Sequence, residues 1–359
     1  MSSSSKKDRV LAVLNGEIPD RVPIFEYLIH DGVFNHFGAG EIPVGSTEHH
    51  IAACSKCLDL CHPVGGLPHE PHERINDDGS KTIVERWMSW NVPAPSQTVQ
   101  SDSEIKAGME RQIEHLENSL GKTAAESDKA KKDAAENVRK LETVIGDMVY
   151  ITAWACTAVP YGNKETGMLA YADYPEIAEK RMRLENTLTL ERLQATAYKE
   201  ISPVAIIWDD IAYKNRLFYS PALLERLYFP ALAEICSLFH SRGIRIVFHS
   251  DGDVSSVLPN LIQCGIDGLN PVETSAGMHY ADVKREYGDK ITIVGGMDAV
   301  DVLAFGSVDE VVAETKRLID IAGKGGGLIA ASSSGQIDMS MPTENVAAFY
   351  ETVWDYGRY

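Results

Sequence analysis

The chain has 359 residues, a net charge of −18 at pH 7 and six cysteines. This acidic balance disfavours nucleic acid and anionic membrane surfaces as partners, because both are bound through basic faces. No apolar run is long enough to cross a bilayer, and the first residues lack the apolar centre of a signal peptide. We therefore expect a cytoplasmic protein.

The chain begins with the pattern of a short helix followed by a buried strand. Residues 7–16 are amphipathic, and residues 22–28 form an apolar run after a proline-bracketed turn. Glu26 lies inside this strand, near its end. A carboxylate there either points into the mouth of a barrel or pairs with a base, and the sequence leaves both alternatives open.

Three cysteines and several histidines occur together in the next helical segment, residues 46–61. Cys54, Cys57 and Cys61 are spaced so that all three sulfurs lie on one helix face. A metal cluster is one interpretation of this pattern. We favour an ordinary buried helix, because free cysteine is a common small core residue in a reduced cytosolic protein.

Residues 73–90 alternate in polarity and contain Asp77-Asp78-Gly79 between their halves, which predicts a β-hairpin. Trp87 in this hairpin either forms part of a lid or pocket wall or simply packs in the core. The charged, alanine-rich stretch 103–145 then has helical periodicity in two parts around Gly121. It predicts a helical hairpin inserted between strands, for which a solvated role is favoured over docking of a partner.

Apolar strand patterns alternate with helical patterns through the rest of the chain, which predicts a TIM (β/α)₈ barrel. The count favours one domain, residues 1–359, over two. The eight expected strands are residues 22–28, 62–65, 150–156, 203–208, 244–248, 266–269, 291–294 and 327–330.

Polar residues follow these apolar strands where a barrel carries its active site. His249 and Asp251 follow one strand, Asp209 and Asp210 another, and Glu273 comes shortly after a third. Two adjacent carboxylates are costly to bury in ionised form, so one of the aspartates is expected to bind a cation or to carry a proton. The alternative roles for these acids are helix capping and salt bridges.

Further candidates for binding a small molecule lie at strand ends or are aromatic residues that could hold a ring. For each of the aromatic residues, simple packing is the favoured alternative. No P-loop, G-x-S-x-G or strand-linked G-x-G-x-x-G motif is present. The candidates are Glu26, Trp87, Trp154, Tyr161, Asn270, Asp298, Ser334 and Gln336.

Several segments resemble the uroporphyrinogen decarboxylase superfamily. They are P-D-R-V-P-I, W-D-D-I-A, F-H-S-D-G-D, G-I-D-G-L-N-P-V-E, Y-G-D-K-I-T-I-V-G-G-M-D and the C-terminal stretch from M-P-T-E-N-V. The resemblance implies a TIM barrel with its pocket at the carboxyl mouth. It also implies one of two activities, porphyrin decarboxylation or corrinoid-linked methyl transfer.

Departures from the family pattern favour the methyltransferase branch. The decarboxylases carry an arginine-rich stretch soon after the first strand, whereas no arginine occurs here between Arg21 and Arg74. The thiol-specific methyltransferases resemble zinc enzymes with a His-x-Cys pair and a later cysteine. Here the pair reads His249-Ser250-Asp251, and the later position appears as Ser334, so oxygen ligands replace sulfur.

The resulting hypothesis is a methyltransferase that moves a methyl group from a methoxylated, aromatic small molecule to the Co(I) of a corrinoid (cobalamin) protein. His249, Asp251 and Glu273 would bind zinc or another divalent cation or form the proton donor, and Asp209 or Asp210 would orient His249 or complete the ligand set. The alternatives are methyl transfer from a methyl-corrinoid to a thiol or folate, a decarboxylase, and a non-catalytic binding relative. A homodimer is compatible with the sequence.

Overall fold

The computed structural model describes the chain apart from residues 1–3, 63–66, 95–101, 122 and 160–170. Its centre is a ring of parallel strands, two positions of which are interrupted and carry two labels each. Around the ring the strands are β1 (Phe25–Glu26) with β2 (Leu28–Ile29), β3 (Leu60–Cys61), β7 (Val149–Tyr150) with β8 (Ala153–Ala155), β9 (Val204–Trp208), β12 (Arg245–His249), β13 (Gly268–Asn270), β14 (Thr292–Met297) and β15 (Leu328–Ser332).

The strand pairing follows the order that the sequence predicts for a barrel. One sheet runs β1-β3-β7 and another runs β8-β9-β12-β13-β14-β15. All these pairs are parallel, and a bridge between Ile24 and Ala330 joins the first strand to the last. The strand expected at residues 62–65 differs: it occupies Leu60–Cys61, and residues 63–66 lie outside the described part of the chain.

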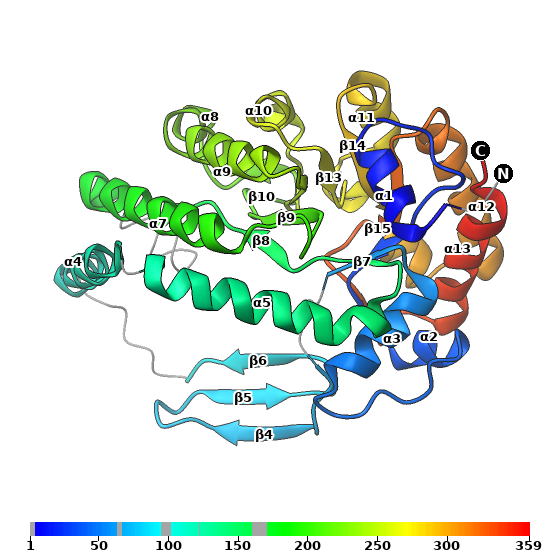
Figure 1. The fold of residues 1–359 in the computed structure, drawn as a ribbon, viewed down its shortest axis with the longest axis horizontal. Helices are drawn as coiled ribbons and strands as arrows, with labels where there is room; N and C mark the ends of the chain where they lie inside the picture. The colour runs from blue at the N-terminus through cyan, green and yellow to red at the C-terminus, as the bar shows by residue number, and fades with distance from the viewer. Residues whose placement is uncertain (1–3, 63–66, 95–101, 122, 160–170) are drawn as a thin grey trace.

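Helices surround the ring (Figure 1). They arise where the sequence shows helical periodicity and suitable ends; Ser307 and Glu310, for example, form a capping box at the start of α12. The helices are α1 (Lys6–Leu14), α2 (Asp31–His36), α3 (Thr47–Cys57), α4 (Asp102–Ser119), α5 (Thr123–Ile145), α7 (Pro175–Thr196), α8 (Pro221–Leu223), α9 (Phe229–Ser241), α10 (Leu258–Cys264), α11 (Tyr280–Tyr287), α12 (Val308–Leu318) and α13 (Thr343–Tyr356).

The hydrophobic core has two parts, one on each side of the barrel wall. The inner part fills the ring with side chains from alternate strand positions, such as Val204 and Ile206 of β9. Val10 and Val13 of α1 belong to the same inner cluster, so α1 closes the amino-terminal end of the barrel. The outer part packs the remaining strand residues against the helices. The carboxyl-terminal end is thereby left for polar groups.

A small antiparallel sheet stands apart from the ring (Figure 1). It contains β4 (His72–Ile75), β5 (Lys81–Val84) and β6 (Ser89–Val92), so the predicted hairpin is present and gains a third strand.

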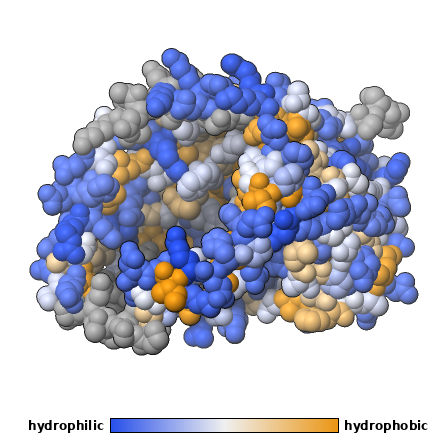
Figure 2. All heavy atoms as spheres, turned by 90° about the horizontal axis from the view of Figure 1, so that it is seen from below, coloured by the Kyte–Doolittle hydropathy of each residue, from blue (hydrophilic) through white to orange (hydrophobic). Residues whose placement is uncertain are grey.

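The face of the molecule seen in Figure 2 is mostly hydrophilic, with apolar side chains in separate patches. Short pairs complete the strands: β10 (Ala212–Tyr213) with β11 (Arg216–Leu217), and β16 (Ile337–Asp338) with β2.

Helices α4 and α5 occupy the stretch predicted as a helical hairpin, and both contact α7. Their status as an insertion relative to other barrels stays a prediction. None of the helices in the described residues is both long enough and apolar enough to span a membrane.

The amino-terminal end of the ring is held by a paired cluster of charges. Asp59, which precedes β3 and is fully buried, accepts hydrogen bonds from Arg9 (2.7 Å) and Arg21 (2.9 Å). Its second oxygen also accepts from the backbone N–H of Ile24 (2.9 Å), and Arg9 binds Asp20 as well. Each buried charge here therefore has an opposite charge beside it, as low-dielectric surroundings require.

Candidate functional site

Alternation along the strands decides which side chains reach the barrel interior at its carboxyl end. Val204 and Ile206 point inward, and Trp208 continues that row at the end of β9. His249 takes the equivalent place at the end of β12, two residues after the inward Val247. The rings of Trp208 and His249 lie 4.3 Å apart, centroid to centroid. His249 is therefore a buried residue of the uppermost interior layer.

Asn270 on the neighbouring strand determines which nitrogen of His249 is the hydrogen-bond donor within the barrel wall. Asn270 of β13 donates from its amide nitrogen to the carbonyl of Val294 (2.8 Å), which turns its oxygen towards His249. That oxygen lies 2.6 Å from His249 Nδ1 and is an acceptor, so Nδ1 must carry the proton. Nε2 is then the nitrogen of His249 left to bind a cation, and it lies beside the carboxylates of Asp210 and Asp251. This arrangement is the usual one for a metal-binding histidine held by a second group.

Two carboxylates stand beside that nitrogen. His249 Nε2 lies 3.7 Å from Asp251 Oδ1 and 3.8 Å from Asp210 Oδ1. The backbone N–H of Asp251 donates to Asp210 Oδ1 (3.1 Å), which ties the two strand ends together. One ligand atom from each of these three residues lies within 4.8 Å of the other two. We call them the Asp210–His249–Asp251 group.

This group fits a divalent cation. Zinc bonds to nitrogen and oxygen are about 2.0–2.2 Å long, so ligand atoms of a tetrahedral site lie about 3.4 Å apart, slightly closer than the distances here. Asp251 Oδ1 is buried without a hydrogen-bond partner among the described residues, as an atom awaiting a metal would be. Burial raises the pKa of Asp251; His249 opposes this shift, and Asp210 and Glu273 add to it. A cation would relieve that repulsion.

Glu273, the third expected ligand, lies near this group without belonging to it. Its carboxylate accepts from the backbone N–H of Gly252 (2.7 Å) and from the hydroxyl of Ser275 (2.8 Å). A Cβ on Gly252 would lie 2.6 Å from the backbone nitrogen of Tyr213, so only glycine fits this turn. Glu273 thus holds the loop that carries Asp251. Its role as a metal ligand stays a prediction.

Asp209 points out of the barrel, away from its neighbour Asp210. Both of its oxygens accept from the backbone N–H of Thr157 (3.0 Å), and one also accepts from the hydroxyl of Tyr228 (2.8 Å). Burial raises the pKa of Asp209 to about 7, although these hydrogen bonds oppose the shift. Asp209 therefore joins the end of β8 to the helix layer. Its backbone N–H donates to the carbonyl of His249 (3.0 Å), whereas the side-chain bonds described for it all go to Thr157 and Tyr228. Its catalytic role stays a prediction.

Glu26 also lies on the helix side of the wall, between the inward residues Phe25 and Tyr27. It accepts from the backbone N–H and the hydroxyl of Ser332 on β15 (2.9 and 3.0 Å), which links the first strand to the last. Burial raises the pKa of Glu26 to about 8. This position favours a structural contact across the barrel seam over the predicted contact with substrate.

The remaining residues predicted to bind substrate lie in different parts of the molecule. Trp87 is buried beside α2 and α3, where its Nε1 donates to Asp31 (3.2 Å). Trp154 of β8 is 47% exposed and lies under the guanidinium of Arg192. Asp298 caps the turn after β14, Ser334 donates to the carbonyl of Gln336, and Gln336 contacts the sulfur of Met88. Tyr161 lies outside the described residues.

The sequence analysis missed three aromatic residues around His249. Tyr27 lies with its ring centre 5.9 Å from that of His249, 5.0 Å from Trp208 and 5.7 Å from His62. The hydroxyl of Tyr27 and Nδ1 of His62 are buried and have no hydrogen-bond partner within the described chain. The available signal was only that these residues lie at or just after the ends of strands; that Tyr27 and Trp208 continue inward rows is known from the structure.

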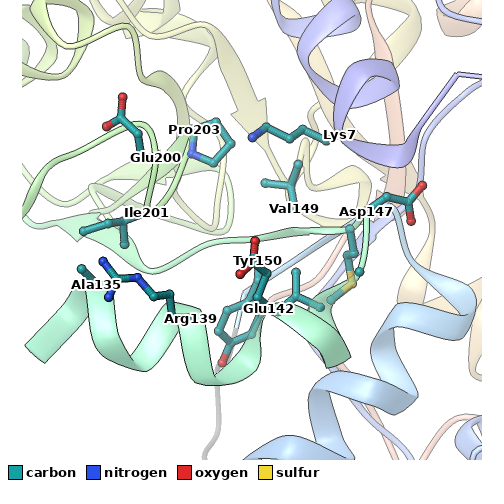
Figure 3. Close-up of a pocket in the computed structure, with 13 residues that line it drawn as sticks. Lys7, Ala135, Arg139, Glu142, Asp147, Val149, Tyr150, Glu200, Ile201 and Pro203 are labelled. Atoms are coloured by element: carbon teal, nitrogen blue, oxygen red, sulfur yellow. The ribbon is translucent and has the colours of Figure 1, made fainter.

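Two cavities flank the barrel at different levels. A cleft of about 940 Å³ lies between α4 and α7 and includes Cys156 and Thr157, which follow β8 beside Asp209. Its lining combines leucines with Arg111, His115 and Arg181. A second cavity, of about 310 Å³, lies at the amino-terminal end, where α1, α5 and the start of β7 meet (Figure 3). The first lies on the level of His249, because Thr157 in its lining bonds to Asp209, the residue that follows β9.

Comparison with known proteins identifies the family. The sequence profile of uroporphyrinogen decarboxylase (URO-D) matches residues 142–356, more than half of the chain. The chain belongs to the URO-D family. The predicted resemblance is thereby confirmed at the level of the family, and the matched region contains the whole Asp210–His249–Asp251 group.

Relatives of this URO-D family member include methyltransferases. Two curated proteins from Methanosarcina barkeri, both methylcobamide:CoM methyltransferase MtaA, are 33% and 34% identical to it over 102 residues. The match spans 28% of this chain and 28% of each relative's length. A solved methyltransferase structure from Methanosarcina mazei has a TM-score of 0.61 at 19% identity and covers 98% of this chain and 99% of its own. That likeness supports the barrel fold.

Proposed function

We propose that this URO-D family member transfers a methyl group from an aromatic methyl ether to the Co(I) of a corrinoid carried by a partner protein. The observation that carries the proposal is the Asp210–His249–Asp251 group, which offers one nitrogen and carboxylate oxygens and no sulfur. Hard ligands of this kind suit a cation that acts on oxygen better than one that holds a thiolate. The similarity to a methylcobamide-dependent enzyme supports the choice of a corrinoid partner.

The chemistry of an aryl ether explains the need for such a site. The leaving phenolate is basic, so its oxygen must be stabilised as negative charge develops on it. A divalent cation held by Asp210, His249 and Asp251 would supply this stabilisation as a Lewis acid. Asn270 leaves Nε2 of His249 free to bind the cation, and Glu273 holds the loop of Asp251. Trp208 and Tyr27 wall off the interior from water.

The cleft between α4 and α7 offers room for the aromatic ring beside the end of β8. Its leucines would contact the ring, and its arginines would suit an acidic substituent. The partner protein would present its corrinoid over the barrel mouth. That corrinoid would supply the Co(I) nucleophile for the methyl carbon, while the cation held by Asp210, His249 and Asp251 would stabilise the leaving oxygen.

Replacement of His249 tests the proposal. We expect His249→Ala to lower the rate of methyl transfer on the order of 10³-fold or more, because the cation would lose its nitrogen ligand and several kcal/mol of stabilisation. The rate is measured from the change in absorbance as Co(I) becomes methyl-Co(III). The assay uses a panel of methoxylated aromatics and a free corrinoid. The matched control is His240→Ala, since His240 binds Asp267 outside the group. Full activity in His249→Ala, or no demethylation of any ether by the wild type, rejects the proposal.

A second candidate is the opposite half-reaction, from a methyl-corrinoid to a thiol. Its support is the sequence similarity to methylcobamide:CoM methyltransferase. Incubation with methylcobalamin and a small thiol separates the two, because thiol methylation without ether cleavage favours this second reaction. Porphyrin decarboxylation has less support, since the stretch between Arg21 and Arg74 holds Lys56 as its single basic residue apart from histidines.

A further inference from the structure

Two unpaired polar groups remain beside the metal-binding group after its own atoms are accounted for. The hydroxyl of Tyr27 and Nδ1 of His62 are both buried, and neither finds a partner in the described residues. A buried polar atom without a hydrogen-bond partner destabilises the fold, so two of them in one place call for an explanation. A cation at Asp210, His249 and Asp251 would satisfy acceptors and would leave these two atoms unchanged.

Both groups belong to the set of aromatic side chains that packs around His249. Tyr27 is 1% exposed, and its ring is perpendicular to that of His249 at 5.9 Å between centroids. The negative charges of Asp251 and Asp210 both act on the Tyr27 hydroxyl, which places it in the field of the metal-binding acids. The ring of His62 completes the layer, 5.7 Å from Tyr27 and 6.2 Å from Trp208.

The two groups are neutral donors. Burial, with the proximity of His249, lowers the pKa of His62 to about 4, so its imidazole is uncharged at neutral pH. In the tautomer that carries its one proton on Nδ1, the buried unpaired atom is a donor. Burial raises the pKa of Tyr27 well above its ordinary value, and the nearby acids add to this effect. The hydroxyl thus keeps its proton. Two neutral donors beside the Asp210–His249–Asp251 group suit an oxygen that gains negative charge.

We propose that Tyr27 and His62 donate hydrogen bonds to the oxygen that leaves when the methyl group is transferred. This inference rests on the proposed function. In the step, the bond between methyl carbon and ether oxygen breaks and its electron pair stays on oxygen. The carbon bonds to cobalt, which supplies two electrons and passes from Co(I) to Co(III). Tyr27 and His62 keep their protons, and the phenolate takes one from water after release.

The binding test uses 4-nitrophenolate, a phenolate whose absorbance reports its ionisation. We expect the zinc-loaded wild-type protein to bind it as the anion. We expect Tyr27→Phe to weaken binding about 10–100-fold, as loss of one hydrogen bond to a charged group does. His62→Phe should weaken it in the same direction. The matched control is Tyr350→Phe, which removes an equally buried and unpaired hydroxyl from α13 in the outer core.

The kinetic test uses methyl aryl ethers whose ring substituents vary the basicity of the leaving phenolate. Tyr27→Phe should slow the most basic leaving groups about 10²-fold and the least basic ones much less, because only a basic oxygen needs the donor. An unchanged dependence on leaving group, unchanged 4-nitrophenolate affinity, or loss of zinc from Tyr27→Phe overturns the inference. Tyr27-dependent 4-nitrophenolate binding in a protein that demethylates no ether would instead leave the donor pair standing and reject the proposed function.

Discussion

The two ends of the barrel treat buried charge in opposite ways. At the amino-terminal end, Asp59 is shared by two arginines and a backbone N–H, and every bond is short. At the carboxyl-terminal end, Asp210 and Asp251 stand side by side with no arginine or lysine bonded to either in the described structure. The first end is neutralised by the chain itself, whereas the second has acceptors in excess.

This difference separates stability from function. In barrels the amino-terminal face contributes to stability and the carboxyl-terminal face carries the chemistry. At the amino-terminal end each buried charge is compensated within the chain, so no ligand is needed to offset its burial. Repelling acids at the second end weaken the fold until a ligand binds, which is the usual compromise at a functional site.

The largest expected effect comes from breaking the paired end. Asp59→Ala leaves Arg9 and Arg21 without their shared partner and should lower the free energy of unfolding by about 3–5 kcal/mol. Urea denaturation followed by circular dichroism measures this. Asp20→Ala removes the more exposed partner of Arg9 and should cost about 1 kcal/mol or less. Equal losses in the two variants would contradict the comparison.

Glu26 sharpens the comparison, because it is a buried acid on the wall with no cation bonded to it among the described residues. Its pKa in the folded protein is about 8, against about 4.5 unfolded, so the folded state binds more protons between these values. The free energy of unfolding should therefore fall by roughly a few kcal/mol as pH rises from about 5 to 8. Glu26→Gln should flatten this dependence in urea denaturation at a series of pH values. A slope identical to wild type would show that Glu26 ionises freely.

The smallest effect is expected at the unpaired end. Asp210→Asn keeps an acceptor for the N–H of Asp251 but removes a negative charge, so zinc affinity should fall at least about 10–100-fold. Stability without metal should stay the same or rise by up to about 1 kcal/mol, since repulsion with Asp251 ends. Calorimetric titration with zinc and thermal unfolding measure the two effects. Asp253→Asn, in the same loop but outside the group, is the control and should change neither.

The sequence predicted the order of strands and helices well because long apolar runs and helical repeats are strong signals. The position of His249 and Asp251 at the carboxyl end of the barrel was predicted for a similar reason, since both lie at the end of a clear strand pattern. Their role as site residues stays a prediction. The strand at Leu60–Cys61 was displaced in the prediction because two residues carry almost no pattern. The third strand of the small sheet, Ser89–Val92, was also missed.

The facing of individual side chains was beyond the sequence. Strands buried on both sides are apolar throughout, so β9 shows no alternation that tells an inward residue from an outward one. Asp209 and Asp210 were therefore indistinguishable, as were Glu26 and Tyr27. Glu273 accepts a hydrogen bond from the backbone N–H of Gly252. The sequence could not predict this contact, because it depends on the conformation of the loop in the folded chain.

The pair Asp209 and Asp210 has a consequence for how this wall tolerates change. Consecutive residues on opposite sides of a strand serve as a lock on its alignment: one aspartate is bonded outside to Thr157 and Tyr228, while the next lies beside His249 Nε2. Deleting a single residue from β9 would turn each aspartate to the opposite side of the barrel wall. Both would then lose their present partners at once. Substitutions in this segment can alter either anchorage independently, but a change in its length cannot.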